Sequence, residues 1–415
     1  MKFTDYSIAY DIKDNLEKLG FRRPTDIQFK SIPPIMRGED VLAIAQTGTG
    51  KTAAFAIPII HQIHERKKVS RTDKVRCIVM VPTHELALQL KEVFDAISNG
   101  MRIKTLCIFG GVEQQPQIDA LYNGADIVIA TPGRMFDLVS QGFLKLDKID
   151  YLILDEADHM LDLGFIKDIQ DMLRFLPKHR QTLFFSATIN EKIKKLAYSL
   201  VTNPIRIQIS PKDPVAKNIQ HAVAYIEMDD KRFFLESIIK EHPENKILIF
   251  VRTKVRAERV AKAMERANIK TLTMHSDKEH EERLKVMDAF KKGMVKILIA
   301  TDINARGIDI PNVDYVINYD LPEQAENYVH RVGRTGRGDK KGQAVSFCST
   351  EEIPVLKEIE TYLDKPIHVL EIDKELYSAT LEFYGNDNIV KEDLKALMLQ
   401  AEKDEALYKK KKKKK

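Results

Sequence analysis

One stretch near the start of the chain combines glycines, hydroxyl groups and a lysine in an order suited to phosphate binding. Its residues are Ala45, Gln46, Thr47, Gly48, Thr49, Gly50, Lys51 and Thr52. It follows the apolar run 41–44 and precedes the helix-forming run 53–56, which predicts a loop between a strand and a helix. In such a loop backbone N–H groups surround phosphates, Lys51 reaches the outer phosphates and the Thr52 hydroxyl binds Mg²⁺. The strict pattern has glycine at the first position, and alanine is small enough to serve there.

Two adjacent carboxylates can complete a nucleotide site of this kind. Asp155 and Glu156 follow the apolar run 151–154, so we expect them at the tip of a buried strand. A carboxylate there can ligate Mg²⁺, as we predict for Asp155, and its neighbour can activate a water molecule, as we predict for Glu156. An acidic strand end alone is more often a solvated turn or a helix cap. The phosphate-binding pattern earlier in the chain makes the catalytic interpretation the stronger one.

The elements that must position these residues share one pattern, a short apolar run that ends in a polar or glycine-rich cluster. The runs are 41–44, 76–81, 127–130, 151–154, 183–185, 247–251, 297–300, 316–319 and 344–347. Near-continuous apolar runs predict strands buried on both faces of a parallel sheet. The stretches 85–97 and 255–267 have helical length and period, so we expect an α/β fold. Ligands of such sheets bind beyond the carboxyl ends of the strands, which makes the polar clusters candidate site residues.

The sequence predicts two domains and an extension. Residues 1–208 and 217–368 are each expected to form one α/β unit, joined by a linker at 209–216 that contains two prolines and no apolar run. Residues 369–415 form a C-terminal extension, within which 389–407 has a helical pattern and runs toward a tail of lysines.

Composition and charge exclude several classes of protein. With 415 residues, 44% of them hydrophobic and 31% charged, the chain can build folded cores and is not disordered throughout. Its longest apolar stretch, 53–60, is far shorter than the roughly 18 residues that cross a bilayer, and no signal peptide is visible. Three dispersed cysteines without metal-ligand spacing fit a reducing compartment. We therefore expect a cytoplasmic protein with no membrane association.

The net charge of +5 is carried by the C-terminal tail. Residues 409–415 are seven consecutive lysines, so the rest of the chain carries −2. Any nucleic-acid site on the folded body must therefore be a local patch. The tail itself is either a solvated end or a non-specific RNA tether, and the sequence does not choose between them.

Further motifs resemble the DEAD-box family of ATP-dependent RNA helicases. They are Asp155-Glu156-Ala157-Asp158, Ser186-Ala187-Thr188, Thr131-Pro132-Gly133-Arg134, the segment 300–309 and the segment 330–337. The resemblance spans about residues 1–350 and is greatest to the bacterial RhlE-like branch. It implies two tandem RecA-like domains, each a parallel sheet flanked by helices. It also implies ATP and Mg²⁺ as cofactors and RNA-stimulated ATP hydrolysis coupled to local unwinding of RNA duplexes.

The resemblance implies further nucleotide contacts, some before the glycine-rich segment and some in the second domain. The segment 1–29 matches the family's adenine-reading region, in which Phe21 offers a ring for stacking and the Gln28 amide can both donate and accept. Gly307 is implied to let the backbone approach the phosphates, and Asp309 to contact the ribose.

Arginines of the second domain are implied to complete the catalytic site. Arg334 and Arg337 match the family's arginine fingers, which stabilise charge on the transferred phosphoryl group, while Lys51 and Glu156 act from the first domain. Hydrolysis then requires the domains to close, and RNA bound to both would favour the closed state. The residues implied in coupling closure to hydrolysis are Ser186, Thr188, His330 and Arg331.

The implied RNA contacts are hydroxyls, backbone N–H groups at helix starts and one arginine. They are Pro82, Thr83, Gly111, Thr131, Gly133, Arg134, Thr253 and Thr301. Such groups suit phosphate and 2′-OH contacts and do not read bases, so we expect binding of single-stranded RNA or short duplexes without sequence preference. Each position alone is better explained as a strand-to-helix turn, and only the set favours RNA.

Three positions depart from the family's pattern. His84 stands where arginine is usual, Ser276 replaces a usual glycine and His280 a usual glutamine. An unperturbed histidine is mostly neutral at pH 7, so one fixed positive charge is missing near the RNA path. We expect these departures to bear on RNA affinity or domain coupling and not on the hydrolytic residues.

The sequence leaves other functions open beside an unwinding ATPase. An ATP-gated RNA clamp would use the same residues and differ only in showing little net duplex separation. A nucleotide-dependent transporter or switch ATPase would show no stimulation by RNA, and the arginines placed in a second domain argue against it. DNA unwinding is a further alternative that 2′-OH contacts would disfavour.

Overall fold

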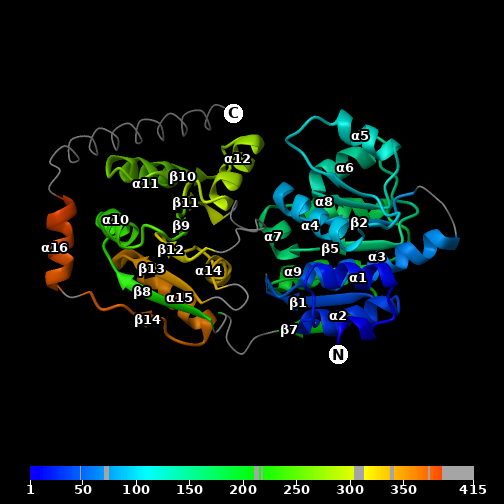
Figure 1. Cartoon of the computed structure of the whole chain (residues 1–415), viewed down its shortest axis with the longest axis horizontal. Coiled ribbons are helices and arrows are strands. Elements are labelled where there is room, and N and C mark those ends of the chain that lie inside the picture. The colour runs from blue at the N-terminus through cyan, green and yellow to red at the C-terminus, as the bar shows by residue number, and fades with distance from the viewer. Residues whose placement is uncertain are drawn as a thin grey trace.

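The computed structural model describes residues 1–46, 48–69, 74–209, 215, 218–302, 313–336, 341–372 and 374–385. They form two parallel sheets of seven strands each, one from the first half of the chain and one from the second. Figure 1 shows each sheet with helices packed around it, the first in blue to green and the second in green to orange. No helix in these ranges is long and apolar enough to span a bilayer. The predicted α/β class with two parallel sheets is confirmed.

The first sheet has the strand order β3-β4-β2-β5-β6-β1-β7, and every neighbouring pair is parallel. Its strands are β1 (Val41–Ala45), β2 (Cys77–Met80), β3 (Thr105–Ile108), β4 (Ile127–Ala130), β5 (Tyr151–Leu154), β6 (Gln181–Ser186) and β7 (Ile205–Ile209). The five inner strands are buried along their whole length. Successive side chains alternate between the two faces, so Val41 and Ala43 join one core and Leu42 and Ile44 the other.

Helices alternate with these strands and cover both faces of the sheet. They are η1 (Phe3–Asp5), α1 (Tyr10–Lys18), α2 (Asp26–Met36), α3 (Lys51–Val69), α4 (His84–Ile97), α5 (Gln115–Tyr122), α6 (Pro132–Ser140), α7 (Ala157–Asp162), α8 (Ile166–Met172), η2 (Leu173–Phe175) and α9 (Glu191–Leu200). On one face Phe55 of α3 lies between Phe94 of α4 and Phe185 of β6, with ring centroids 6.1 and 5.1 Å away. This aromatic packing fixes α3, the helix that begins at Lys51, against the centre of the sheet.

The second sheet repeats the plan with the order β10-β11-β9-β12-β13-β8-β14, again entirely parallel. Its strands are β8 (Ile219–Tyr225), β9 (Ile247–Phe250), β10 (Thr271–Met274), β11 (Ile297–Ala300), β12 (Tyr315–Asn318), β13 (Gly342–Cys348) and β14 (His368–Val369). The helices are α10 (Lys231–Glu241), α11 (Lys254–Arg266), α12 (His280–Lys291), α14 (Ala325–Val332), η3 (Thr350–Glu352), α15 (Ile353–Leu363) and α16 (Lys374–Gly385).

Helix α16 ties the start of the C-terminal extension to the second sheet. The Tyr377 hydroxyl donates to Asp230 Oδ2 at 2.7 Å and accepts from the Glu227 backbone N–H at 3.2 Å. The Tyr377 ring also packs on Phe234 of α10, with centroids 4.9 Å apart. The extension expected from residue 369 therefore begins as part of the second structural unit, while its predicted helix at 389–407 lies outside the described residues.

Each apolar run singled out in the sequence is a strand, whereas β3, β7, β8, β10 and β14 were not predicted. Four of these five are the outermost strands of their sheets and β8 lies next to an outermost strand, and β3, β7 and β14 have partly exposed residues. A strand covered on fewer sides needs less apolar sequence, so its pattern is weak. The strand β8 mixes Gln220 and His221 into its apolar residues, which hides it in the same way.

Candidate functional site

The strand order brings the expected nucleotide-binding residues to one place. Strands β5, β6 and β1 are neighbours in the first sheet. The glycine-rich segment follows β1, Asp155 follows β5, and Ser186 is the last residue of β6. Because the strands are parallel, their carboxyl ends lie on the same edge, and all three groups meet there.

The glycine-rich loop has a backbone that requires its glycines. Gly48 has φ +80° and Gly50 has φ +92°, in the left-handed region that favours glycine. The Thr49 hydroxyl donates to the Gln46 carbonyl at 2.7 Å and closes the loop, and helix α3 begins at Lys51. The loop therefore leads directly into a helix N-terminus, as expected for a phosphate site.

Gln28 lies against this loop. Its side-chain N–H donates to the Gly50 carbonyl at 3.1 Å, and its side-chain oxygen accepts from the Thr25 backbone N–H at 2.9 Å. A Cβ at position 50 would lie 2.5 Å from the Gln28 amide nitrogen, so a larger residue would displace the Gln28 amide from this place. Each amide atom keeps one further hydrogen-bonding capacity, which suits the predicted role in reading adenine. Phe21 is half-buried, and its ring meets Phe3 edge-on at 5.9 Å.

Lys51 is buried without a hydrogen-bond partner among the described residues. It is 6% exposed, and its charge acts on both Asp155 and Glu156. A buried ammonium group without partners is costly, and phosphate oxygens would satisfy its three donors. This unpaired nitrogen at the end of a glycine-rich loop fits a nucleoside triphosphate.

The pKa values of the two carboxylates after β5 are shifted in opposite directions. Burial raises the pKa of Asp155 to about 6, although the Lys51 charge opposes this shift. Burial would also raise the pKa of Glu156, but His159, Lys51 and Arg334 outweigh it and bring the pKa to about 2. Environments that separate the pKa values of neighbouring acids are typical of catalytic sites. Glu156 is thus ionised at neutral pH, as a general base must be.

Glu156 also has a strained backbone. Its φ and ψ are 51° and 48°, the left-handed conformation that costs a non-glycine residue roughly 1–2 kcal/mol. This conformation turns the chain sharply from β5 into α7. Such strain persists where the surrounding structure imposes it, and it is common at active sites.

Asp158 joins the segment after β5 to the segment after β6. Its Oδ2 accepts from the backbone N–H groups of Ala187 and Thr188, at 3.2 and 2.9 Å, and from the Thr188 hydroxyl at 3.0 Å. Ser186 is fully buried, and its hydroxyl has no partner among the described residues. Of the expected coupling residues, Thr188 is therefore bonded to the helix that follows Glu156.

We expect the variant Thr188→Val to lower duplex separation about tenfold while ATP binding stays intact. The change removes one hydrogen bond to a carboxylate, which contributes about 1.5–3 kcal/mol, and leaves the two backbone bonds to Asp158 in place. Duplex separation and ATP affinity measured side by side check this. The matched control is Thr361→Val, whose hydroxyl bonds only the Lys357 carbonyl on an exposed helix. Equal loss in both variants would contradict the prediction.

The second domain supplies a positive charge to this site. Arg334 follows α14, is 4% exposed, and its charge helps to lower the pKa of Glu156. A second contact joins the domains, because Arg283 of α12 pairs with Glu85 of α4 at 3.3 Å. The structure thus brings Lys51, Glu156 and Arg334 together from two domains.

Arg331 is buried inside the second domain. Its guanidinium makes two bonds to the Asp302 carboxylate, at 2.5 and 2.7 Å, and donates to the Asp320 carbonyl at 2.6 Å and to Asn318 Oδ1 at 3.3 Å. It also lies over the Phe250 ring at 5.0 Å. These contacts join the ends of β9, β11 and β12, so Arg331 fixes the platform from which Arg334 extends.

Replacing Arg331 with Met is expected to destabilise the second domain by about 3–5 kcal/mol. The substitution leaves the Asp302 carboxylate without its partner in a largely buried site, and breaking a buried ion pair on one side carries this cost. Denaturant unfolding followed by circular dichroism measures it. Arg259→Met, on an exposed position of α11, is the control and should change stability by less than about 0.5 kcal/mol. A variant as stable as the control would show that Arg331 is dispensable for folding.

The predicted RNA contacts of the first domain lie on the other half of the first sheet. Gly111 follows β3, Thr131 follows β4, and Pro82 and Thr83 follow β2, and these three strands are neighbours. Thr83 caps α4 by accepting from the Leu86 N–H at 3.3 Å, and its hydroxyl can still donate its own hydrogen. Along this edge of the sheet, the predicted RNA contacts therefore lie on one half and the predicted nucleotide-binding residues on the other.

Two of the remaining predicted contacts occupy the matching half of the second sheet. Thr253 follows β9 and caps α11 by accepting from the Arg256 N–H at 3.2 Å, and Thr301 follows the neighbouring strand β11. In the first domain, Gly133 is in the first turn of α6, and Arg134 donates to the Val112 carbonyl at 2.9 Å. Arg134 thereby holds the loop that contains Gly111.

His84, one of the departures from the family pattern, supports the same loop. Its ring stacks on Phe109 with centroids 4.9 Å apart, and a Cβ built on Gly111 would lie 3.3 Å from its Cε1. The His84 ring thus packs against Phe109 at a position where the family's usual arginine would carry a positive charge. Ser276 is exposed, and the side chain of His280 lies outside the described residues, as do Thr47, Gly307, Asp309 and Arg337.

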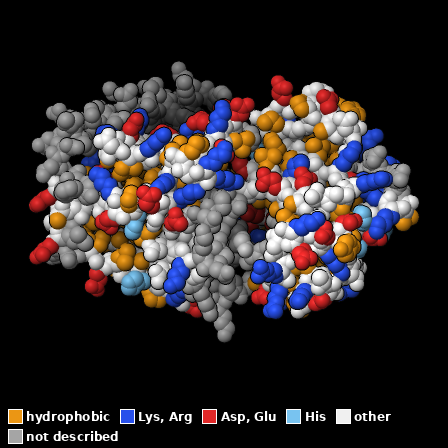
Figure 2. Space-filling view, in the orientation of Figure 1, with side chains coloured by type: hydrophobic (Ala, Val, Ile, Leu, Met, Phe, Trp, Pro, Cys, Tyr) orange, Lys and Arg blue, Asp and Glu red, His pale blue; other side chains and the backbone are white. Residues whose placement is uncertain are grey.

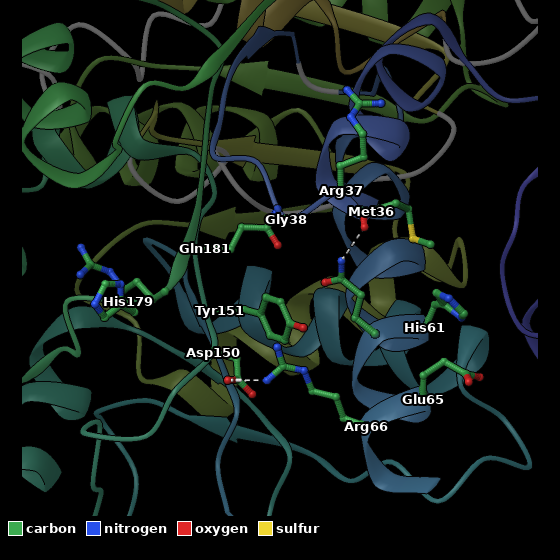
Figure 3. A pocket seen from close by; sticks show the side chains of 12 residues that line it. Met36, Arg37, Gly38, His61, Glu65, Arg66, Asp150, Tyr151, His179 and Gln181 are labelled. Atoms are coloured by element: carbon green, nitrogen blue, oxygen red, sulfur yellow. Dashed lines mark hydrogen bonds and ion pairs between the residues drawn. The ribbon is translucent and has the colours of Figure 1, made fainter. Parts of the chain in front are cut away.

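A pocket of about 500 Å³ occupies the opposite edge of the first sheet (Figure 3). It is lined by the start of β5, the start of β6 and the second half of α3. Figure 3 shows Arg66 paired with Asp150, at 2.6 Å, and Arg37 is paired with Glu39 at 2.8 Å. Since Lys51 begins α3 and Arg66 is near its end, about 22 Å of helix separates this pocket from the glycine-rich loop. The pocket is distinct from the nucleotide site.

The surface agrees with the low charge of the folded body. Figure 2 shows Lys and Arg side chains spread over both halves of the visible face with acidic groups between them. On this face the described residues therefore form no single large positive field.

Comparison with known proteins identifies the family. The profile of the DEAD/DEAH box helicase family matches residues 25–196, and that of the helicase conserved C-terminal domain matches residues 230–339. The chain is 37% identical to ATP-dependent RNA helicase DbpA of Bacillus subtilis over 89% of this chain and 76% of that protein. It is 37% identical to ATP-dependent RNA helicase RhlB of Shewanella sediminis over 90% of this chain and 87% of that protein.

The structure is also similar to that of a solved two-domain relative. A variant of S. cerevisiae Dbp5 bound to RNA and ADP BeF3 aligns with a TM-score of 0.81 at 28% identity, over 92% of this chain and 98% of that chain. The same variant bound to nup159, gle1, IP6 and ADP aligns with a TM-score of 0.62 at 27% identity, over 92% and 100% of the two chains. The fold is therefore that of tandem RecA-like domains, in an arrangement more similar to the RNA-bound one. With matching sequence profiles, relatives and fold, this chain belongs to the DEAD-box family of ATP-dependent RNA helicases.

Proposed function

We propose that this RNA-dependent ATPase hydrolyses ATP between Lys51 and Glu156 of its first domain and Arg334 of its second. The observation that supports this most directly is that the positive charges of Lys51 and Arg334, from two domains, both act on Glu156 and lower its pKa. Three groups suited to phosphoryl transfer converge from two domains, each with its own sheet. Lys51, Glu156 and Arg334 can act on one ATP molecule only when the two domains are closed.

Each residue has a role that follows from its chemistry. Lys51 binds the outer phosphates, and Glu156 accepts a proton from the water that attacks the γ-phosphorus while the bond to ADP breaks. Arg334 stabilises the charge on the transferred group, with Arg337 as its proposed second member.

Thr52 and Asp155 are the proposed protein ligands of Mg²⁺. Within the described residues no group of three metal-binding side chains occurs, which fits an ion held mainly by phosphates and water. The buried Asp155, with its raised pKa, is a carboxylate that a nearby cation would stabilise in its charged form. When bound, Mg²⁺ neutralises charge on the phosphate oxygens.

RNA is proposed to act by holding the domains closed. The predicted contacts lie at the ends of β2, β3 and β4 in one sheet and of β9 and β11 in the other. An RNA strand that binds both sets stabilises the arrangement in which Arg334 reaches Glu156. Since these contacts use backbone and hydroxyl groups, closure depends on RNA shape and 2′-OH groups and not on sequence.

Several finer assignments also belong to this proposal. We retain the domain extents 1–208 and 217–368, the linker 209–216 and the extension 369–415. We also retain a cytoplasmic location and a place in the RhlE-like branch, although the relatives named above belong to other branches.

The proposal is tested by steady-state ATP hydrolysis with and without single-stranded RNA, and with DNA of the same sequence. We expect strong stimulation by RNA and little by DNA, and separation of a short RNA duplex under the same conditions. Equal stimulation by both nucleic acids would contradict the 2′-OH contacts. ATP hydrolysis stimulated by RNA without duplex separation would favour the clamp.

A further inference from the structure

His159, which follows the Asp155–Asp158 motif, is a buried histidine beside the proposed general base. It is the third residue of α7 and is 4% exposed. Its Nδ1 lies 3.5 Å from Glu156 Oε2. Neither ring nitrogen has a hydrogen-bond partner among the described residues.

The contact follows from the local geometry of the chain. Glu156 is the residue that precedes α7, and a side chain three positions later in a helix lies over the residue that precedes the helix. A buried polar ring without a partner is costly, and the Glu156 carboxylate is the only acidic group within ion-pair distance of His159 in the described structure. The pairing is therefore built into the helix start.

Glu156 needs such a partner. No other hydrogen bond or ion pair to its side chain occurs in the part of the chain that is described, and its backbone is held in the left-handed conformation. Without His159, the carboxylate could rotate away from the attacking water. A displacement of about 1 Å at a reacting group can lower a rate about 100-fold.

We propose that His159 is a positioning residue for ATP hydrolysis, in which Nδ1–H holds the Glu156 carboxylate in the orientation that accepts a proton from water. This inference rests on the proposed role of Glu156 as general base. The distance of 3.5 Å is longer than a hydrogen bond, and catalytic hydrogen bonds commonly shorten when substrate binds. The charge of His159 is not required, because a neutral ring with its hydrogen on Nδ1 makes the same contact.

Two substitutions separate positioning from packing. His159→Leu keeps a similar volume and removes the donor, whereas His159→Asn is smaller but keeps an N–H donor at about the position of Nδ1. We expect Leu to lower kcat about 10- to 100-fold with unchanged KM for ATP and unchanged RNA affinity, and Asn to restore most of the rate. A packing role predicts the reverse order, because Asn leaves the larger cavity.

The experiment measures kcat, KM and RNA affinity for both variants, with His179→Leu at an exposed position as the control. A wild-type rate for Leu, or a larger loss for Asn than for Leu, would overturn the inference whatever the stability of either variant.

Glu156→Gln distinguishes a failure of this inference from a failure of the proposed function. If Glu156→Gln is fully active, the role of the base itself is wrong. If Glu156→Gln lowers the rate about 10²- to 10⁴-fold, adding His159→Leu should lower the remaining rate no further, since both act through one group. An additional loss in the double variant would show that His159 acts elsewhere.

Discussion

Replacing Glu156 with Gln should reduce RNA-stimulated ATP hydrolysis about 10²- to 10⁴-fold, because the amide cannot accept a proton from the attacking water. The substitution keeps the shape of the side chain and its place beside Lys51. Glu156 is ionised at neutral pH in the folded chain, with a pKa of about 2, so the wild-type base is ready without a prior proton transfer. The loss should appear in kcat, with little change in the KM for ATP.

The same variant should still bind ATP and RNA together. Lys51, the glycine-rich loop and Arg334 are unchanged, so the domains can close without hydrolysis and RNA should remain bound for longer. RNA affinity in the presence of ATP measures this directly. Glu191→Gln, at a side chain that is 80% exposed, is the matched control and should behave as the wild type. Retained hydrolysis in Glu156→Gln would remove Glu156 from the role of general base.

Arg334→Ala is expected to lower kcat about 10³-fold or more, the range seen when an arginine finger is removed. Arg334 is buried at the start of the turn after α14, and its charge reaches Glu156 of the other domain. Its removal takes away both the charge that would stabilise the transition state and the electrostatic attraction of this residue to Glu156 of the first domain. ATP-dependent RNA affinity should therefore fall as well, in contrast to Glu156→Gln.

A second substitution tests which property of Arg334 matters. Arg334→Lys keeps the positive charge and loses the planar group that can bond two oxygens at once, so an intermediate rate is expected. Arg259→Ala, on an exposed position of α11, is the control. If Arg334→Ala lowers ATP hydrolysis no more than the control does, the second domain does not act on the phosphates through this residue.

Much of the nucleotide site could be predicted because its chemistry is local. The glycines, Lys51 and Thr52 lie within eight residues between an apolar run and a helix, and Asp155 and Glu156 directly follow a strand. In such segments the backbone conformation depends on the residues themselves, as the positive φ angles of Gly48 and Gly50 show. The buried strands were visible for the same reason, since being covered on two faces demands a continuous apolar run.

The roles of Arg331, Asp158 and His159 could not be read in the same way. Arg331 was expected to couple the domains, and the structure shows that its guanidinium is bonded to Asp302, Asp320 and Asn318 within one domain. Asp158 has no motif of its own beyond the one it completes, yet it binds the segment after β6. The three-residue spacing of His159 from Glu156 is compatible with a contact between them. Only the structure shows that the His159 ring is buried, which is why this contact matters.

The sequence by itself determined which chemical groups this protein has, which of them adjoin strands and helices, and that its two halves repeat one plan. Only the tertiary structure decided that the ends of β5, β6 and β1 gather the proposed nucleotide-binding residues and that those of β3, β4 and β2 gather the proposed RNA contacts. It alone also placed Arg334 within electrostatic reach of Glu156. The physical reason is that parallel strands pair in an order different from their order in the chain. Long-range pairing and the contact between domains depend on the packing of whole elements, which no short stretch of residues encodes.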